Sequence, residues 1–458
     1  MYTDDTIAAI ATPPGHGGIG IIRVSGRLAP SIGAALFVRS HDGERWVSHR
    51  LYHGHVVDAE AAIVDEGLAV LMRAPHSFTG EDVVELHCHG SPVVLRRVLA
   101  SVLGSGTRLA EPGEFTRRAF LNGRIDLAQA EAVIDLIRAR TAAAATLAAE
   151  QLSGHLSTYV SDMRDRVIRL KALLEAQIDF SEEDFEVSVE ELLASIDGCV
   201  APIGALLQTY QHGKIIRDGV RVAIIGKPNV GKSSLLNALL GEERAIVTPV
   251  AGTTRDAIDE AVDLEGVPVT LSDTAGLRDA DAADAVERLG MERTAGRIAE
   301  GQLLLTVLDA SQPLDAQDQS VLEAHADAAQ VIVLNKIDLP QATAETDVRR
   351  FANSHPIVSV SATQRMGLID LRRVLLEQIT TGATVGNTPV LISLRHVDAL
   401  TKARDSLLLA RASIVAHRPP DLVAVDVQDA IDHIGAVTGA IASEDVLDRI
   451  FSEFCIGK

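Results

Sequence analysis

The spacing of hydrophobic residues changes along the chain, and the first part indicates a domain of mixed strands and helices. The segment DVVELHCHG (82–90) alternates apolar and polar side chains, which is typical of a strand with one buried face. IGIIRVSG (19–26) is predicted to form another strand, and PVVLRRVLASVL (92–103) a helix with proline in its first turn. We therefore predict an α+β domain over residues 1–118.

The next stretch changes to a helical period. Residues 127–152 are rich in alanine and leucine, which are strong helix formers. A seam of apolar residues then steps by four and three alternately, through Leu156, Val160, Met163, Val167, Leu170 and Leu174. Such a seam packs one helix against others in a bundle, and this role is favoured over a cofactor site. We predict an all-α helical bundle in two parts, residues 119–219 and 383–458.

Between the two helical parts, residues 220–382 alternate short apolar strands with helices. The strand segments are VRVAIIG, PVTLSDT, QLLLTVLD, QVIVLNK and PIVSVSA. This order is the signature of a doubly wound parallel sheet with helices on both faces. Because helices flank this segment on both sides, we predict an α/β domain inserted into a single helical domain, which close termini permit.

Composition narrows the class of protein. A chain of 458 residues is expected to form about three domains. Its net charge of −21 argues against a general nucleic-acid coat, although a local basic patch could hold an RNA. Its three cysteines, Cys88, Cys199 and Cys455, form no C-x-x-C pair, which fits a reducing cytosol. With no basic N-terminal signal and no apolar run near the ~18 residues that span a bilayer, we predict a cytoplasmic protein without membrane association.

Five motifs, in order, indicate the chemistry of the α/β domain. GKPNVGKS (226–233) is a complete phosphate loop, and it follows a predicted strand and precedes a predicted helix. TTRD (253–256), DTAG (273–276), NKID (335–338) and VSA (360–362) come after it. NKID narrows the base to guanine, because an aspartate accepts hydrogen bonds from both N1–H and the exocyclic amine, and adenine has no such pair of donors. The sequence therefore predicts a P-loop GTPase.

The motif residues have predicted roles at the phosphates. Lys232 should reach the β- and γ-phosphates, and the Ser233 hydroxyl should bind Mg²⁺. Thr254 is expected to bind Mg²⁺ when a γ-phosphate is present, Asp273 to support the metal, and the Gly276 N–H to contact the γ-phosphate. The predicted GTP-binding set is completed by Asn229, Val230, Gly231, Ser234, Thr248, Thr253, Thr274, Ala275, Asn335, Lys336, Asp338, Ser361 and Ala362.

Hydrolysis needs a group that these motifs do not supply. Leu277 stands where many small GTPases carry a glutamine that orients the attacking water. Asn229 could offer its side-chain carbonyl to a monovalent cation beside the phosphates, and Glu287 could orient water. From spacing alone, however, a solvated helix residue beside Arg288 is the favoured interpretation of Glu287.

Longer segments carry a resemblance to a known family. They are ATPPGHGGIGIIRVSG (11–26), SFTGEDVVELHCHG (77–90), PGEFTRRAFLNGRIDLAQAEA (112–132), GTTRD (252–256) and the terminal FCIGK. Together, in this order and over essentially all 458 residues, they resemble the MnmE (TrmE) family of tRNA-modification GTPases.

The resemblance implies a K⁺-dependent GTPase. Asn229 would bind K⁺ in the phosphate loop, and the backbone around Thr248, Val250 and Thr253 would complete the site. Glu287 falls on the family's catalytic glutamate, which reverses the interpretation from spacing. Two GTPase domains would meet across their nucleotides, with K⁺ compensating for a missing arginine finger. The predicted catalytic set is Asn229, Arg255, Asp256 and Glu287.

The resemblance also implies a folate site, and a homodimer formed through the N-terminal domain. Arg23, Glu85 and Arg124 match the family's folate positions, where relatives also carry lysine in place of Arg124. A pterin ring offers paired donors to a carboxylate, and a glutamate tail attracts cations; without the family, a surface ion pair would be favoured. The ligand would be 5-formyltetrahydrofolate or methylenetetrahydrofolate, with Lys458 as a further contact and Cys455 as a functional thiol.

As a partner, the resemblance implies an FAD-containing protein of the MnmG (GidA) family, in a heterotetramer or larger assembly. Together they would add an aminomethyl or carboxymethylaminomethyl group to C5 of the wobble uridine of certain tRNAs, with the one-carbon unit coming from tetrahydrofolate. The flavin would belong to the partner, because GHGGIG (15–20) lacks the βαβ setting of a dinucleotide site.

Three other interpretations stay open. A ribosome-assembly GTPase would share the phosphate loop and DTAG, but the chain has no basic RNA-binding extension, and the folate residues would have no purpose there. A membrane-remodelling GTPase is disfavoured because no basic amphipathic segment is present. A zinc site at His87-Cys88-His89 is disfavoured because Cys88 faces the opposite side of a strand from both histidines, and no second cluster of cysteine and histidine exists.

Overall fold

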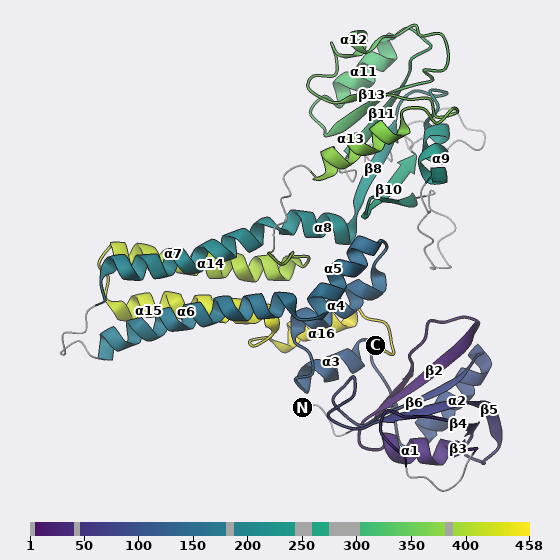
Figure 1. The fold of residues 1–458 in the computed structure, drawn as a ribbon, viewed down its shortest axis with the longest axis vertical. Helices are drawn as coiled ribbons and strands as arrows, with labels where there is room; N and C mark the ends of the chain where they lie inside the picture. The colour runs from purple at the N-terminus through teal and green to yellow at the C-terminus, as the bar shows by residue number, and fades with distance from the viewer. Residues whose placement is uncertain (1–4, 41–45, 180–186, 243–258, 274–302, 381–387) are drawn as a thin grey trace, which may run out of the picture. The chain divides into compact units, whose positions relative to one another are not determined.

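The chain divides into two compact units. The computed structural model describes residues 5–40, 46–179, 187–242, 259–273, 303–380 and 388–458 (Figure 1). Unit 1 comprises Met1–Ile134, Gln151–Asp165 and Ile431–Lys458. Unit 2 comprises Asp135–Glu150 and Arg166–Ala430.

The described part of unit 1 contains a seven-stranded sheet with the strand order β3-β4-β5-β6-β2-β1-β7. The strands are β1 (Ile7–Ile10), β2 (Gly17–Ser25), β3 (Phe37–Arg39), β4 (Leu51–Val57), β5 (Ile63–Met72), β6 (Val83–Gly90) and β7 (Arg108–Leu109). Neighbouring strands are antiparallel except β1 and β7, which are parallel. The α+β character, both predicted strands and the predicted helix over 92–103 are confirmed.

Alternation along the strands separates the core of unit 1 from its other face. Helices α1 (Ala29–Leu36) and α2 (Pro92–Gly104) pack on the buried side chains of Val24 and Leu86. Because successive residues of a strand point to opposite faces, Arg23 of β2 and its cross-strand neighbour Glu85 of β6 lie on the face that these helices do not cover.

A second core of unit 1 joins helices from both ends of the sequence. Helices α3 (Glu114–Leu121), α4 (Leu127–Arg138) and α16 (Glu444–Ser452) surround it. Its buried members are Leu127, Ala130, Val133, Leu447, Phe451 and Phe454. The last residues of the chain are therefore anchored by packing against the segment that follows the sheet.

Residues 142–218 and 394–438 are mainly helical. The helices are α5 (Ala142–Leu152), α6 (His155–Asp179), α7 (Val189–Gln208), α8 (Tyr210–Asp218), α14 (Leu394–Val415) and α15 (Pro420–Thr438). All six residues of the predicted seam in α6 are buried, which confirms its packing role. The alanine-rich stretch 127–152 forms two helices, α4 and α5, and the Thr141 hydroxyl accepts the N–H of Ala144 where α5 begins.

One continuous helical stretch of the described residues, Val189–Asp218, is long and apolar enough by length and composition to cross a membrane. The prediction that no apolar run approaches this length is therefore wrong for this stretch. A single stretch of this kind is weak evidence, because core helices of soluble proteins pass the same test. Its residues Ile196, Ile203 and Leu206 are buried, and α7 packs along α14.

The α/β part of unit 2 is a six-stranded sheet with the order β13-β12-β11-β8-β10-β9 among its described strands. They are β8 (Val220–Ile225), β9 (Asp259–Leu264), β10 (Val267–Asp273), β11 (Leu303–Asp309), β12 (Gln330–Asn335) and β13 (Ile357–Ser359). The sheet is parallel, as predicted, except that β9 pairs antiparallel with β10 at one edge. The short turn at Glu265–Gly266 allows that hairpin, and the sequence analysis had not included it.

Helices cover both faces of this sheet. Val222 and Ile224 of β8 face a core that includes α9 (Lys232–Glu242) and α13 (Leu368–Thr380). Ala223 and Ile225 point the other way, toward the face of α11 (Ala316–Ala324), and α12 (Glu345–Val348) packs on that face as well. The carboxyl ends of the parallel strands are thereby left uncovered by helix bodies, which is where ligands bind in such folds.

Candidate functional site

The phosphate loop lies at the carboxyl end of β8, in the middle of the α/β sheet. β8 ends at Ile225 and α9 begins at Lys232, so the loop spans 226–231. Lys232 is 6% exposed, and its Nζ donates to the carbonyl oxygens of Gly226 at 2.9 Å and Lys227 at 2.7 Å. The loop therefore folds around this ammonium group, in the position that suits phosphate binding at a helix N-terminus.

Residues of the NKID segment brace the loop from the end of β12. Asn335 is 2% exposed; its Nδ2 donates to the carbonyl of Val230 at 2.9 Å, and its Oδ1 accepts the N–H of Ala362 at 3.1 Å. Gly231 has a φ of +96°, and a Cβ at this position would lie 2.3 Å from Asn335 Nδ2, so glycine is required. The segment predicted to read the base and the loop predicted to hold the phosphates are thus bonded to each other.

Lys336 adds a second link between these segments. Its Nζ donates to the carbonyl of Asn229 at 2.7 Å and to Asp309 Oδ2 at 2.7 Å. Burial favours a raised pKa for Asp309, but hydrogen bonds from Lys336 and Ser311 outweigh it and hold the pKa of this carboxyl below its usual value. Asp309 was not predicted; its place as the last residue of QLLLTVLD, at the carboxyl end of a strand, is the signal that could have indicated it.

The other predicted nucleotide residues are either at this edge of the sheet or outside the described residues. The exposed ones are Asn229, Ser233, Ser234 and Asp338. Ser361 is buried, and Asp273 ends β10 beside β8. Outside the described residues lie Thr248, Val250, Thr253, Thr254, Arg255, Asp256, Thr274, Ala275, Gly276 and Glu287. The roles given to all these residues stay predictions.

A second cluster lies on the face of the unit 1 sheet that α1 and α2 leave uncovered. Arg23 Nε donates to Glu85 Oε1 at 2.8 Å, and His87 Nε2 lies 3.3 Å from Glu85 Oε2. The guanidinium of Arg23 lies 5.3 Å from the ring centre of Phe78 and 5.7 Å from that of Phe115. Burial works against the charge of Glu85, yet hydrogen bonds from His87 and Arg23 keep its pKa below the usual value.

The end of the chain docks onto this same domain. Ile456 forms an isolated antiparallel bridge with Pro112. Gly457 has a φ of +98°, and a Cβ there would lie 2.3 Å from the carbonyl oxygen of Ile10. The absence of a side chain therefore lets the tail approach the end of β1 closely.

The docked tail places Lys458 beside the Arg23–Glu85 pair. Burial and the nearby charge of Arg23 lower the pKa of Lys458, and Glu85 and Cys455 oppose this shift. Cys455 itself is exposed. Arg124 is exposed in the turn between α3 and α4 and takes no part in these contacts. The structure thus brings together three of the four predicted folate residues and the predicted thiol.

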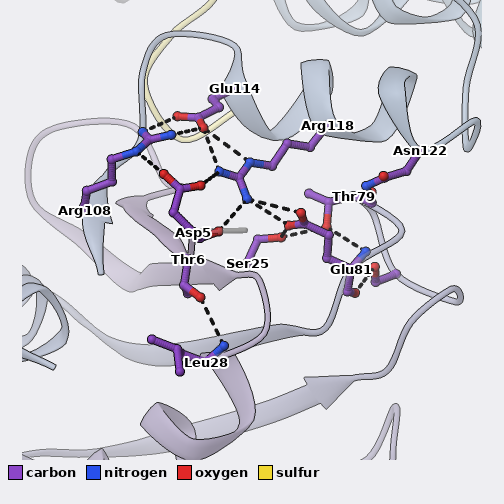
Figure 2. Close-up of polar contacts among 11 residues, drawn as sticks. Asp5, Thr6, Ser25, Leu28, Thr79, Glu81, Arg108, Glu114, Arg118 and Asn122 are labelled. Carbon is purple, nitrogen blue, oxygen red and sulfur yellow. Dashed lines mark hydrogen bonds and ion pairs between the residues drawn. The ribbon is translucent and has the colours of Figure 1, made fainter. Parts of the chain in front are cut away.

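A cluster of arginines and carboxylates lies next to this site, and the sequence analysis did not identify it. Figure 2 shows Arg118 between three carboxylates: Asp5 at 2.7 Å, Glu114 at 2.9 Å and Glu81 at 3.2 Å. Arg108 also pairs with Glu114, by a hydrogen bond of 2.8 Å. We call Asp5, Glu81, Arg108, Glu114 and Arg118 the arginine–carboxylate cluster. Arg118 is 4% exposed and Glu114 3%, so the centre of the cluster is buried, while Arg108 at its edge is exposed.

The arginine–carboxylate cluster holds the walls of the Arg23 site. Glu81 ends the loop that carries Phe78, and Glu114 precedes Phe115 in α3, so both flanking rings are attached to the cluster. Burial opposes the charge of Glu114, but hydrogen bonds from Arg108 and other donors hold its pKa below the usual value. The closely spaced charges of PGEFTRRAF (112–120) are the sequence signal that could have indicated an ion-pair cluster. Their partners Asp5 and Glu81, however, come from distant parts of the sequence.

The structure does not support the zinc alternative. His87 contacts Glu85, while Cys88 lies buried on the opposite face, where burial raises the pKa of its thiol to about 12. His89 pairs with Asp65 at 2.8 Å. No group of three or more possible metal ligands occurs among the residues that the structure describes.

Comparison with known proteins decides the family. The model of the "GTP-binding protein TrmE N-terminus" matches residues 6–124, and that of the "MnmE helical domain" matches residues 127–455. A "tRNA modification GTPase MnmE" from Geotalea uraniireducens is 47% identical, and one from Natranaerobius thermophilus is 43% identical; each alignment covers 100% of both chains. The chain belongs to the MnmE family.

The solved structure of a variant of Aquifex aeolicus Era bound to GDP.AlF4- covers 42% of this chain and 67% of its own, with 25% identity and a TM-score of 0.28. The family therefore rests on the full-length relatives, and the tRNA-modification class is favoured over the ribosome-assembly and membrane-remodelling alternatives.

Proposed function

We propose that the protein is a GTP hydrolase that takes part in tRNA modification. The observation that carries this proposal is the phosphate loop closed around Lys232 and hydrogen-bonded to Asn335 of the guanine-type motif. The full-length similarity to proteins named tRNA modification GTPases supplies the process. Purified full-length protein should hydrolyse GTP with Mg²⁺ and leave ATP untouched. Equal turnover of both nucleotides would contradict the proposal.

Within that site, we assign Mg²⁺ to the Ser233 hydroxyl and base recognition to Asp338. Both residues are exposed at the carboxyl edge of the sheet, on either side of the braced loop, so a nucleotide can reach them. When bound, Mg²⁺ neutralises charge on the phosphates. Thr254, with Asp273 in support, and the catalytic roles of Glu287, Arg255 and Asp256 belong to the same proposal.

Potassium dependence is a finer part of the proposal. Asn229 is exposed at the tip of the loop with a φ of +65°, and its backbone carbonyl is held by Lys336, which leaves its side chain to face a cation. Thr248, Val250 and Thr253 would complete that site. GTP turnover should be faster in KCl than in NaCl, and Asn229→Ala should remove the difference.

Two further variants make the potassium experiment specific. Because Asn229 has a positive φ, Asn229→Gly removes the side chain without adding backbone strain and should behave like Asn229→Ala. Asn237→Ala removes an exposed asparagine of α9 and should keep the preference for KCl. Equal rates of the unaltered protein in both salts would rule out the potassium site while leaving the GTPase intact.

We also propose that the Arg23–Glu85 cluster binds a formyl- or methylenetetrahydrofolate. The support is chemical: a carboxylate held between a guanidinium and an imidazole, two aromatic rings and the Lys458 ammonium match a ligand with paired donors, a flat ring and an acidic tail. Arg124 and the Cys455 thiol are included by family resemblance.

Calorimetric titration with 5-formyltetrahydrofolate tests the folate site. Saturable binding is expected, and Arg23→Ala and Glu85→Ala should each weaken it about tenfold or more. Arg73→Ala is the matched control, because Arg73 forms an exposed ion pair with Asp82 of the same domain. Full-strength binding by both site variants would show that the ligand sits elsewhere.

The remaining parts of the proposal concern assembly. We propose that the α/β domain is inserted into the helical domain, that the N-terminal domain forms a homodimer, and that the protein works on tRNA with an FAD-containing MnmG partner. By strand register, Leu51 and Leu68 lie on the same face of the sheet as Glu85, and both side chains are exposed. Exposed apolar side chains on one face support the proposal that a second copy of the chain covers it. Leu68→Lys should therefore raise the monomer fraction in sedimentation; an unchanged distribution would exclude this face.

A further inference from the structure

Lys227, the second residue of the phosphate loop, is tied to a helix outside the predicted motifs. Its Nζ lies 2.7 Å from Asp315 Oδ2 and 2.7 Å from Asp318 Oδ2. Asp315 is the N-cap of α11, and Asp318 is its third residue. The side chains of Lys227 and Asp318 are 18% and 8% exposed, so this pair is largely removed from solvent, whereas the Asp315 side chain is 58% exposed. A buried pair matters more than one on an open surface.

The same residue is bonded to Lys232 through its backbone. The carbonyl of Lys227 accepts a hydrogen bond from Lys232 Nζ at 2.7 Å, which is shorter than the bond of 2.9 Å from Nζ to the carbonyl of Gly226. The side chain of Lys227 is thus bound to α11, while its backbone carbonyl accepts a hydrogen bond from Lys232.

The two carboxylate oxygens of Asp315 have different partners. Its Oδ1 accepts the N–H groups of Gln317 at 2.9 Å and Asp318 at 3.0 Å, and these bonds cap α11. Its Oδ2 pairs with Lys227 at 2.7 Å. Asp318 Oδ2 accepts the Asp315 N–H at 3.3 Å and closes a capping box. The loop is therefore bound to a helix end whose own geometry is fixed.

We propose that Lys227 is a positioning residue of the nucleotide site, held by Asp315 and Asp318. It orients the carbonyl that holds Lys232, and it neutralises two carboxylates that would otherwise repel the phosphates. The inference rests on the proposed function as a GTP site. Its electrostatic part has a specific consequence: the loss of Lys227 should weaken GTP binding more than GDP binding, because GTP carries one more negative charge.

The test uses Lys227→Met in the full-length protein, with a fluorescent GDP and a fluorescent non-hydrolysable GTP analogue as probes. The affinity for the GTP analogue should fall about tenfold, with a smaller fall for GDP, since a charged hydrogen-bond network is lost. High salt should shrink the difference between the nucleotides by screening the exposed carboxylates. Lys227→Arg should restore most of the affinity.

Two further variants separate charge from folding. In the Lys227→Met background, Asp315→Asn keeps a good N-cap and removes one uncompensated charge, so part of the GTP affinity should return. Arg373→Met removes an exposed cation from α13 and should bind both nucleotides like the unaltered protein. Binding of the GTP analogue by Lys227→Met at full strength would overturn the inference. So would an equal loss for both nucleotides without recovery by Lys227→Arg. If the unaltered protein bound neither probe, the proposed GTP site would itself be wrong.

Discussion

The two sites of this chain are built in opposite ways. In the α/β domain, the phosphate loop is one short segment whose own carbonyls hold Lys232, and its braces come from the ends of neighbouring parallel strands. In unit 1, the Arg23 site combines side chains from β2, β6, α3 and the last residues of the chain. The first site depends on local backbone geometry, and the second depends on long-range packing.

This difference determines which changes should damage each site. A binding site made from one loop is disrupted mainly by substitutions within that loop. A site made from distant segments can also be disrupted by substitutions of residues that hold those segments together without contacting the ligand. The arginine–carboxylate cluster and the docked tail are such supports in unit 1.

Arg118→Met should destabilise unit 1 by about 4 kcal/mol, because it leaves the buried carboxylate of Glu114 and the partly exposed carboxylates of Asp5 and Glu81 without their shared cation. Trp46 is the single tryptophan of the chain and packs against Phe37 and Tyr52, so its fluorescence in a urea titration reports unfolding of unit 1. Nucleotide affinity should be unchanged.

The control for this experiment is Arg73→Met, which breaks an exposed ion pair in the same unit. Its cost should stay below about 1 kcal/mol. If Arg118→Met cost no more than this control, the arginine–carboxylate cluster would not support the site, and the comparison between the two regions would fail.

Gly457→Ala should reduce affinity for 5-formyltetrahydrofolate about tenfold, because the new Cβ would overlap the backbone of Ile10 and force the tail away from Arg23. Calorimetry measures this effect, and Trp46 fluorescence should show little change in the stability of the sheet. Gly104→Ala is the matched control, since a Cβ at that helical position meets nothing within 4 Å. Normal folate binding by Gly457→Ala would show that the tail is not part of the site.

The smallest predicted effect concerns acid. The pKa of Glu114 is lower in the folded protein than its ordinary value of 4.5, so its ion pairs stabilise unit 1 above that value. As pH falls from above 4.5 through the folded-state pKa, this stability should be lost. Glu114→Gln lacks the titrating group and should therefore lose less stability as the pH falls below 4.5, which Trp46 fluorescence in urea titrations measures. Parallel pH curves for the two proteins would contradict this assignment.

The sequence was informative wherever periodicity or a contiguous motif defined the structure. The strands 19–26 and 82–90, the buried seam of α6 and the strand–loop–helix setting of the phosphate loop all follow from local spacing. The start of α5 at Thr141 does not follow from local spacing, because the surrounding residues are all strong helix formers and obscure the capping residue. The antiparallel edge strand β9 does not follow either, because the pattern of one strand does not show whether its neighbour runs parallel or antiparallel.

The supports of the sites were beyond sequence reasoning for a physical reason. Glu114 and Arg118 are one helical turn apart and suggest only a surface pair, until Asp5 and Glu81 from distant segments join them in the interior. Lys227 likewise has its partners in another helix, and Asp309 acquires its role only through Lys336. Long-range contacts between charged groups leave no period in a sequence.

The docking of the tail also sets an order in time during synthesis. Residues 7–109 contain every strand of the unit 1 sheet, and they leave the ribosome long before residues 455–458 are made. The Arg23–Glu85 pair can therefore form before Gly457 is translated, and the close approach of Gly457 to the backbone of Ile10 can form only afterwards. A product whose translation stopped early would carry the sheet and the phosphate loop, yet its Arg23 cluster would lack the ammonium group of Lys458.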